Sequence, residues 1–529
     1  MNRYNLLCIV YACLGSVFYG YDSGCTTSVL GYPAFLEYFN LNSVTIGAFG
    51  SAYYGGHVLG ACLNFWLPNK IGRLRTIQIA CVISFLGISM QVGASSFPVF
   101  CAGRIIGGTA TGIMFCLCPT YVSELSPPHI RGRVGGLYAF NGNFSYMFTE
   151  WVGLGCFFLK SNASWRLLLG GQLVPSVLML GLSFFMPFSP RWLALKGRYE
   201  ECLQVLKRMH GDMHDDTFYL KEYHQIKAQI ELDKKEHLGP SAIWRVPSYR
   251  KRIFLVCMFA FCSQLTGEIP LQNYQVILFG KLGLSQVMSL VLTGIWGSVG
   301  VCSAIYAGYL SDKLGRRKII YIMYFFVLSG SLISVVLWSR FEAGGSTNRG
   351  LGRGVIVGMF MVQFGYAGPA NVFMPAVSFK SLSPSGGGRV HSIFSFLYKR
   401  NGKQNSKNAE TTECQTDHDP IFQYSSEIMP TAIRSIGVAA TFACLHAIII
   451  LLVQVTPLAI DAISWKYFLI FLIGSTIYFI FFCFAYPETK NMTLEEIEAV
   501  FGDKVAETLE EAGQHLEEVY EDRAYSEKM

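Results

Sequence analysis

Apolar runs of about 20 residues recur along nearly the whole of this 529-residue chain. A run of that length, wound as an α-helix, crosses the roughly 30 Å hydrocarbon layer of a bilayer. Twelve runs can be distinguished, centred near Leu14, Gly55, Phe85, Ala110, Phe144, Leu178, Phe261, Ser298, Phe326, Met361, Ala447 and Ile473. Only 15% of the residues are charged and 52% are hydrophobic, which is unusual for a soluble domain. The sequence therefore predicts an all-α membrane protein with twelve transmembrane helices in a lipid bilayer.

Lysine and arginine are unevenly shared between the loops that join these runs. If the amino terminus is cytoplasmic, the inner loops hold Lys70, Arg73, Arg75, Arg131, Arg133, Lys313, Arg316, Arg317 and Lys318, and the outer loops hold Lys160, Arg166, Lys281, Arg340, Arg349, Arg353 and Lys466. The connection over residues 188–252 carries thirteen more and is assigned to the inside. Cytoplasmic loops are enriched in these residues, so we expect both termini in the cytoplasm. We also expect the protein at the plasma membrane. The net charge of +7 reflects this bias, and we expect no nucleic-acid partner.

Two motifs occur once in each half of the chain. LPNKIGRLR aligns without gaps with LSDKLGRRK, which pairs Gly72 with Gly315, and SELSPPHIRG aligns with SEIMPTAIRS, which pairs Glu124 with Glu427. Two related six-helix halves are implied, with a substrate site between them near the middle of the bilayer. The expected division is an amino-terminal half over 1–187, a cytoplasmic linker with short helices over 188–252, a carboxy-terminal half over 253–490 and an acidic cytoplasmic tail over 491–529.

Several further motifs follow one another in a fixed order. They are FYGYDSG from Phe18, GRIIGG from Gly103, PTYVSELSPPHIRGR from Pro119, PFSPRWLALKGR from Pro187, DKLGRR from Asp312 and PETKNMTLEEI from Pro487. In these motifs the chain resembles the sugar porters of the major facilitator superfamily, especially the fungal members. The resemblance implies a secondary active transporter that works by alternating access on a sugar or related polyhydroxylated solute. It also implies a protein without a cofactor, which we expect to be a monomer.

Charged residues of the repeated motifs form a candidate cytoplasmic gate. Charge-assisted hydrogen bonds between helix ends can hold one side of the bundle shut. The candidates are Arg73, Glu124, Arg131, Asp312, Arg316, Glu427 and Arg434. Alternatively, these residues only anchor loops to lipid headgroups. Asn69 stands where the family usually has Asp, and Phe188 replaces the Glu of its PESPR motif, so we expect a looser lock in the amino-terminal half.

Asp22 lies within or at the end of the first apolar run. A carboxylate there is costly and needs a partner or a function. Arg104 in the fourth run is the candidate partner. The resemblance implies that these positions face each other and that protonation of the Asp releases the Arg, which couples a proton to transport. The alternative is a permanent structural ion pair.

The substrate site departs from the family pattern. A sugar needs amides or carboxylates for its hydroxyls and aromatic rings for its apolar faces. The family's seventh helix usually reads QQxxGxN, whereas this chain has SQLTGEIPLQNY from Ser263. The candidate ligands are Gln264, Glu268, Asn273 and Tyr274, with Gln272 beside them, and Asn141 in the fifth run, with Asn143 nearby. Glu268 is open to three interpretations, as a substrate ligand, a second proton site or a residue at the lipid boundary. These departures from the family pattern weaken the case for a common hexose as the substrate.

A polar segment interrupts the carboxy-terminal half. Glu427 follows Gly368 by 59 positions, where the resembled family needs about ten. Removing residues 377–423 restores a family-like sequence, GPANVFMPAYSSEIMPTAIRS. The codons possible at the two ends fit the donor and acceptor signals of a fungal intron. A retained intron is therefore our preferred interpretation, and a disordered cytoplasmic loop is the alternative.

Other classes of protein fit less well. The sequence shows no nucleophile and base pair, no metal-ligand cluster and no phosphate-binding loop, so we expect neither an enzyme nor an ATP-driven pump. A nutrient sensor of the same fold would be expected to lack Asp22 and Arg104 and to carry a long signalling tail. Polyols and cyclic acids such as quinate remain alternative substrates. Asn162, in an outer-loop sequon, is a candidate glycosylation site.

Overall fold

A computed structural model describes residues 3–126, 131–159, 161–210, 218–235, 247–314, 316–345, 348–373 and 434–485. The described part consists of helices and short connections. Its membrane-length segments are α1 (Arg3–Val29), α3 (Ser43–Leu63), α5 (Arg73–Val92), α6 (Phe97–Leu125), α7 (Arg131–Phe157), the pair α8 (Ala163–Gly170) and α9 (Leu173–Ser183), the pair α14 (Pro247–Gln264) and α15 (Glu268–Lys281), α16 (Gln286–Leu314), α17 (Arg316–Ala343), α18 (Arg349–Phe373), α20 (Arg434–Ile463) and α21 (Tyr467–Ala485). Each of the twelve centres expected from the sequence falls inside one of these segments, so the twelve-helix prediction is confirmed.

Length and apolar composition alone identify seven stretches able to cross a membrane among the described residues, the last of which covers both α20 and α21. The segments that this criterion leaves out are α3, α7, the α14–α15 pair and α18. Glycine, polar residues and charged helix ends interrupt their apolar runs. Such interruptions are tolerated where a helix faces other helices of the bundle instead of lipid.

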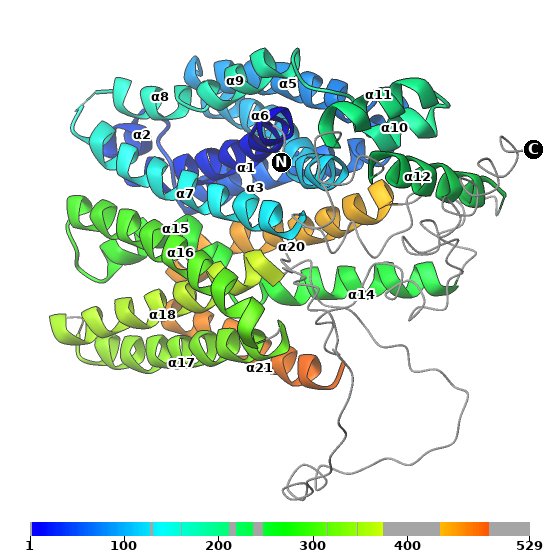
Figure 1. Cartoon of the computed structure of the whole chain (residues 1–529). Helices are drawn as coiled ribbons and strands as arrows, with labels where there is room; N and C mark the ends of the chain where they lie inside the picture. The colour runs from blue at the N-terminus through cyan, green and yellow to red at the C-terminus, as the bar shows by residue number, and fades with distance from the viewer. Residues whose placement is uncertain are drawn as a thin grey trace, which may run out of the picture.

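The helices form two groups, with α1–α9 above and α14–α21 below in Figure 1. The short helices α10 (Pro190–Leu195), α11 (Tyr199–His210) and α12 (Phe218–Lys235) lie together at one end of the bundle, which we call the linker end. The short helix α2 (Pro33–Tyr38) lies at the opposite end, which we call the distal end.

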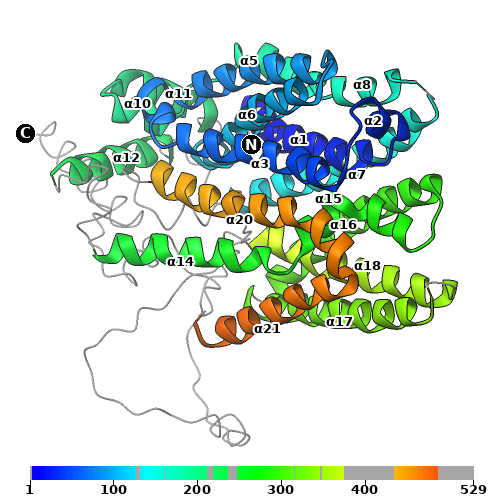
Figure 2. The same ribbon diagram turned by 180° about the vertical axis from the view of Figure 1, so that it is seen from behind.

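The two groups meet along two pairs of helices. The first pair is α3 with α20, which lie side by side in Figure 2, and the second is α7 with α16. Close approach in the second pair depends on a missing side chain, because a Cβ added to Gly297 would lie 2.7 Å from the Cα of Met147. Small residues serve helix packing in membranes in this way. The space left between the two contact seams holds the pocket described below.

The seventh membrane segment is broken between α14 and α15. Gly267 has a φ of 78°, in the left-handed region that other residues rarely adopt, and it precedes the first residue of α15. A Cβ at this position would also overlap the ring of Phe471. Both the backbone conformation and the nearby ring therefore require glycine at this position. The break places Glu268 at the start of a new helix in the middle of the bundle.

Candidate functional site

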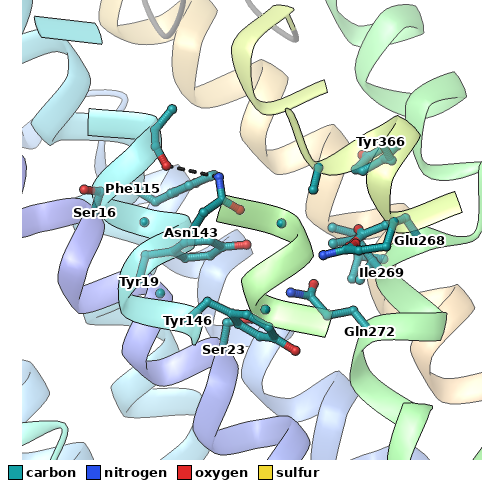
Figure 3. A pocket seen from close by; sticks show the side chains of 18 of the residues that line it. Ser16, Tyr19, Ser23, Phe115, Asn143, Tyr146, Glu268, Ile269, Gln272 and Tyr366 are labelled. Atoms are coloured by element: carbon teal, nitrogen blue, oxygen red, sulfur yellow. Dashed lines mark hydrogen bonds between the residues drawn. The ribbon is translucent and has the colours of Figure 1, made fainter. Parts of the chain in front are cut away.

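A pocket lies between the two groups of helices (Figure 3). It contains about 900 Å³ of space free of protein atoms, a figure that includes solvent at its opening. The amino-terminal group contributes Ser16, Tyr19, Ser23, Phe115, Asn143 and Tyr146. The carboxy-terminal group contributes Gln264, Glu268, Ile269, Gln272, Tyr366 and His446. The pocket thus has the position that two rocking halves would give to a substrate site.

Two amides in the pocket wall have an oxygen without a hydrogen-bond partner. Gln264 donates its Nε2 to Ser263 Oγ at 3.1 Å and to the Tyr366 hydroxyl at 3.4 Å, and its Oε1 is unpaired. Gln363 donates to the carbonyl oxygen of Trp296 at 3.4 Å, and its Oε1 is also unpaired. Buried acceptors are normally paired. These two oxygens are therefore candidates to accept hydrogen bonds from the hydroxyl groups of a bound solute.

The predicted ligands divide into two sets. Gln264 and Glu268 line the pocket. Asn273, Tyr274 and Asn141 are not among the described lining residues. The helical repeat of α15 directs positions 268, 269 and 272 toward the pocket and the next two residues toward neighbouring helices.

The contacts of Asn273 and Tyr274 show what they do instead. Asn273 donates to the Tyr54 hydroxyl at 3.0 Å, and the Tyr274 hydroxyl donates to the carbonyl oxygen of Val453 at 2.8 Å. They join α15 to α3 and α20. On α7, Asn143 lines the pocket and Asn141 does not.

Hydrogen bonds join the two groups on the distal side of the pocket. Thr27 of α1 donates to the carbonyl oxygen of Gln272 at 3.2 Å, and its hydroxyl lies 3.4 Å from that of Tyr146. Gln275 of α15 donates to the Tyr146 hydroxyl at 3.1 Å. These contacts separate the pocket from the distal end, and they have to break for a solute to pass that way.

Asp22 and Arg104 face each other in the amino-terminal group, as expected. Arg104 Nη1 lies 3.5 Å from Asp22 Oδ1 and 3.0 Å from Thr26 Oγ1, and Thr111 donates to the other Asp22 oxygen at 2.8 Å. The guanidinium lies 4.3 Å above the Phe49 ring, and its Nε and Nη2 have no hydrogen-bond partner. Both side chains are buried. The contact is long for a buried ion pair, and Arg104 retains other favourable contacts if Asp22 loses its charge.

The pair lies directly behind the pocket wall. Asp22 does not line the pocket, but Tyr19 and Ser23 of the same helix do. A change in the position of α1 caused by Asp22 would therefore move pocket-lining side chains.

The amino-terminal half of the candidate gate is formed at the linker end. Arg73 Nη2 lies 2.9 Å from Glu124 Oε1, and Ser189 donates to Glu124 Oε2 at 2.5 Å. The predicted loosening stays a prediction. Asn69 accepts from Arg73 at 3.4 Å in place of the usual Asp, and Phe188 stacks on the ring of Trp192 with 5.4 Å between centroids. The substitutions thus replace charge with amide and aromatic contacts.

The other gate candidates are described only in part. Arg131, Arg316 and Arg434 are the first residues of α7, α17 and α20, and Asp312 lies in the last turn of α16. The structure describes the backbone of these four and not their side chains, and Glu427 lies outside the described residues. Asn162 is exposed beside α8 at the distal end, where its Oδ1 accepts from Trp165 Nε1 at 3.3 Å.

The sequence analysis missed three buried ionisable residues. Glu150 of α7 accepts from Ser28 at 2.5 Å, and its other oxygen is unpaired. His57 of α3 and His446 of α20 come from opposite groups, with 4.6 Å between ring centroids, and both nitrogens of His57 lack a hydrogen-bond partner. An ionisable residue inside an apolar run was the signal that identified Asp22, and it would have identified these as well.

A family model described as "Sugar (and other) transporter" matches residues 7–385 and 419–501. The chain belongs to this sugar transporter family. The high-affinity glucose transporter of Kluyveromyces lactis is 28% identical over 95% of this chain and 86% of its own length. The arabinose-proton symporter of Bacillus subtilis is 26% identical over 92% of this chain and 93% of its own.

Among solved structures, the proton:xylose symporter XylE bound to 6-bromo-6-deoxy-D-glucose matches with a TM-score of 0.71 and 22% identity, over 94% of this chain and 99% of that one. At this identity the likeness establishes the fold alone. It agrees with the twelve-helix architecture of the major facilitator superfamily.

The family match leaves out residues 386–418, within the segment over 377–423 that the sequence analysis identified as inserted. The segment lies outside the described residues. We predict that sequencing transcripts across this region will find messages without codons 377–423, which encode a 482-residue product. Messages that uniformly contain those codons, or genomic DNA without splice signals at the two ends, would refute the retained intron.

Proposed function

We propose that this sugar transporter family member is a secondary active transporter. It carries a sugar or a related polyhydroxylated solute across the membrane by alternating access, in symport with a proton. The observation that supports the substrate class best is the pair of unpaired amide oxygens of Gln264 and Gln363, in a pocket that also presents aromatic side chains. Hydroxyl groups pair such acceptors, and ring faces cover the apolar sides of a sugar.

The proposed coupling follows from the contacts of Asp22. A proton on Asp22 removes the charge that attracts Arg104, which then keeps its contact with Thr26 and the Phe49 ring. Loss of this attraction weakens the contact between α1 and α6, and Tyr19 and Ser23 change position in the pocket wall. The proton and the solute thereby favour the same conformation, which is what coupling requires.

Alternating access needs contacts that break in turn. The pair of Arg73 and Glu124 holds the linker end, and the bonds of Thr27 and Tyr146 to α15 hold the distal end. Opening one end while the other stays closed exposes the pocket to one side of the membrane at a time. We assign the linker end to the cytoplasm, with both termini, and place the monomeric protein in the plasma membrane.

Replacing Gln264 with Ala should weaken solute affinity about 2- to 10-fold, because a lost hydrogen bond costs roughly 0.5–1.5 kcal/mol. Surface expression should not change. Direct binding to the purified protein, measured for the solute that the wild type transports, checks the affinity. Asn141→Ala is the matched control, since Asn141 is an amide outside the pocket lining. Equal affinities for wild type and Gln264→Ala would remove Gln264 from the site.

A nutrient sensor would use the same pocket without moving the solute. Binding in the absence of uptake or exchange would identify that alternative. The buried Asp22–Arg104 contact favours transport, because a sensor has no need of a titratable pair behind the pocket wall.

A further inference from the structure

Glu268 is the one formally charged side chain among the described residues that line the pocket, which include no lysine or arginine. The side chain is buried, with 4% of the residue exposed. In the described part of the chain it makes no hydrogen bond and no ion pair. Figure 3 shows it on the carboxy-terminal side, across the pocket from Tyr19 and Asn143.

The other buried carboxylates of the described membrane helices all have partners in the protein. Asp22 contacts Arg104 and Thr111, Glu124 contacts Arg73 and Ser189, and Glu150 accepts from Ser28. Glu268 differs from them in facing the pocket. A buried carboxylate without a partner is costly, and a cationic group in the pocket would lower that cost.

The position of Glu268 offsets part of the cost of its negative charge. It is the first residue of α15, a helix of 14 residues, and the N-terminus of a helix stabilises negative charge. The same position puts the backbone N–H groups of the first turn near the carboxylate. A cationic group on the solute would supply the remaining stabilisation of the anionic form.

We propose that Glu268 selects solutes by charge, and that the preferred cargo is a polyhydroxylated compound with a protonated amine, of the amino-sugar class. This inference rests on the proposed transport function. The ammonium group pairs with Glu268, while hydroxyls donate to the free oxygens of Gln264 and Gln363. The rings of Tyr19 and Phe115, stacked at 4.3 Å, add an aromatic surface that also suits a cation.

The same arrangement disfavours anionic cargo. A carboxylate such as that of quinate would be buried beside Glu268, with no lysine or arginine among the described lining residues to offset the repulsion. Neutral sugars should bind with an affinity between those of cationic and anionic solutes, because they leave Glu268 unpaired without repelling it.

The test compares glucosamine, N-acetylglucosamine, glucose and glucuronate in direct binding to the purified full-length protein. We expect glucosamine to bind about tenfold or more tightly than glucose and N-acetylglucosamine, since hydrogen bonds to charged groups are roughly twice as strong as neutral ones. Glucuronate should bind most weakly. Glu268→Gln should bring glucosamine and glucose to within about twofold of each other. Glu150→Gln, which removes a buried carboxylate outside the pocket lining, should keep the preference.

Binding of the four compounds to the wild-type protein tests the charge preference even if Glu268→Gln fails to fold. Equal or tighter binding of glucose than of glucosamine would overturn the inference and leave the proposed sugar transport standing. A preference that persists in Glu268→Gln would also overturn it. Failure of all four compounds to bind would count against this inference and against the proposed substrate class together.

Discussion

Asp22→Asn is expected to abolish accumulation of solute against its gradient while exchange and binding are partly kept. The amide imitates the protonated carboxyl group, so the variant stays in the state in which Arg104 is released. Net uptake driven by a proton gradient then stops, but the pocket residues are unchanged. Proteoliposomes separate the two activities, because a proton gradient drives accumulation and counterflow reports exchange without one.

The control for this variant is Glu201→Gln, which neutralises an exposed carboxylate that pairs with Arg198 in the linker. It should accumulate solute as the wild type does. If Asp22→Asn accumulates solute with the wild-type dependence on pH, Asp22 has no coupling role, and the pair with Arg104 is structural.

Arg73→Ala is expected to shift the protein toward states that are open at the linker end. Arg73 and Glu124 are paired with side chains only 6% and 1% exposed, and removing one partner of a buried pair costs about 3–5 kcal/mol. The cost falls on the state in which the pair is formed, which is the closed state in the proposed mechanism. Hydrogen–deuterium exchange should therefore rise at the ends of α5 and α6 that lie next to the linker helices, without a comparable rise at the distal end.

Arg198→Ala serves as the matched control. It breaks an exposed arginine–glutamate pair, with side chains 42% and 49% exposed, and such pairs contribute about 0–1 kcal/mol. Adding Glu124→Gln to Arg73→Ala should reverse part of the effect, because the unpaired charge is gone. A uniform rise in exchange over both ends would mean that the pair stabilises the fold without acting as a gate.

Most of the fold could be predicted from the sequence, because crossing a bilayer imposes a length and a composition on each helix. The break between α14 and α15 was harder to predict. Gly267 belongs to a recognisable motif, but its left-handed backbone and the ring of Phe471 against it become visible only in three dimensions.

The candidate site was predicted less completely. Gln264 and Glu268 were found through the motif that contains them, whereas Asn273 and Tyr274 were proposed as ligands and instead contact α3 and α20. Adjacent residues on a helix point about 100° apart, so an error of one position moves a side chain out of the pocket.

Contacts between helices left no local signal in the sequence. His57 and His446 lie in opposite halves of the chain, and nothing near either residue indicates that their rings meet. Glu150 was visible as a charge in an apolar run, but its partner Ser28 comes from α1. The partners of such residues depend on how the helices pack, which the sequence pattern does not specify.

Solute transport coupled to protons can be measured with the purified protein in proteoliposomes. A panel of radiolabelled sugars, amino sugars, polyols and organic acids is supplied outside, with and without an inward proton gradient. We expect at least one polyhydroxylated solute to accumulate above its external concentration, and a protonophore to abolish the accumulation. Accumulation that is indifferent to the proton gradient, or no movement of any sugar, amino sugar or polyol in the panel, would contradict this expectation.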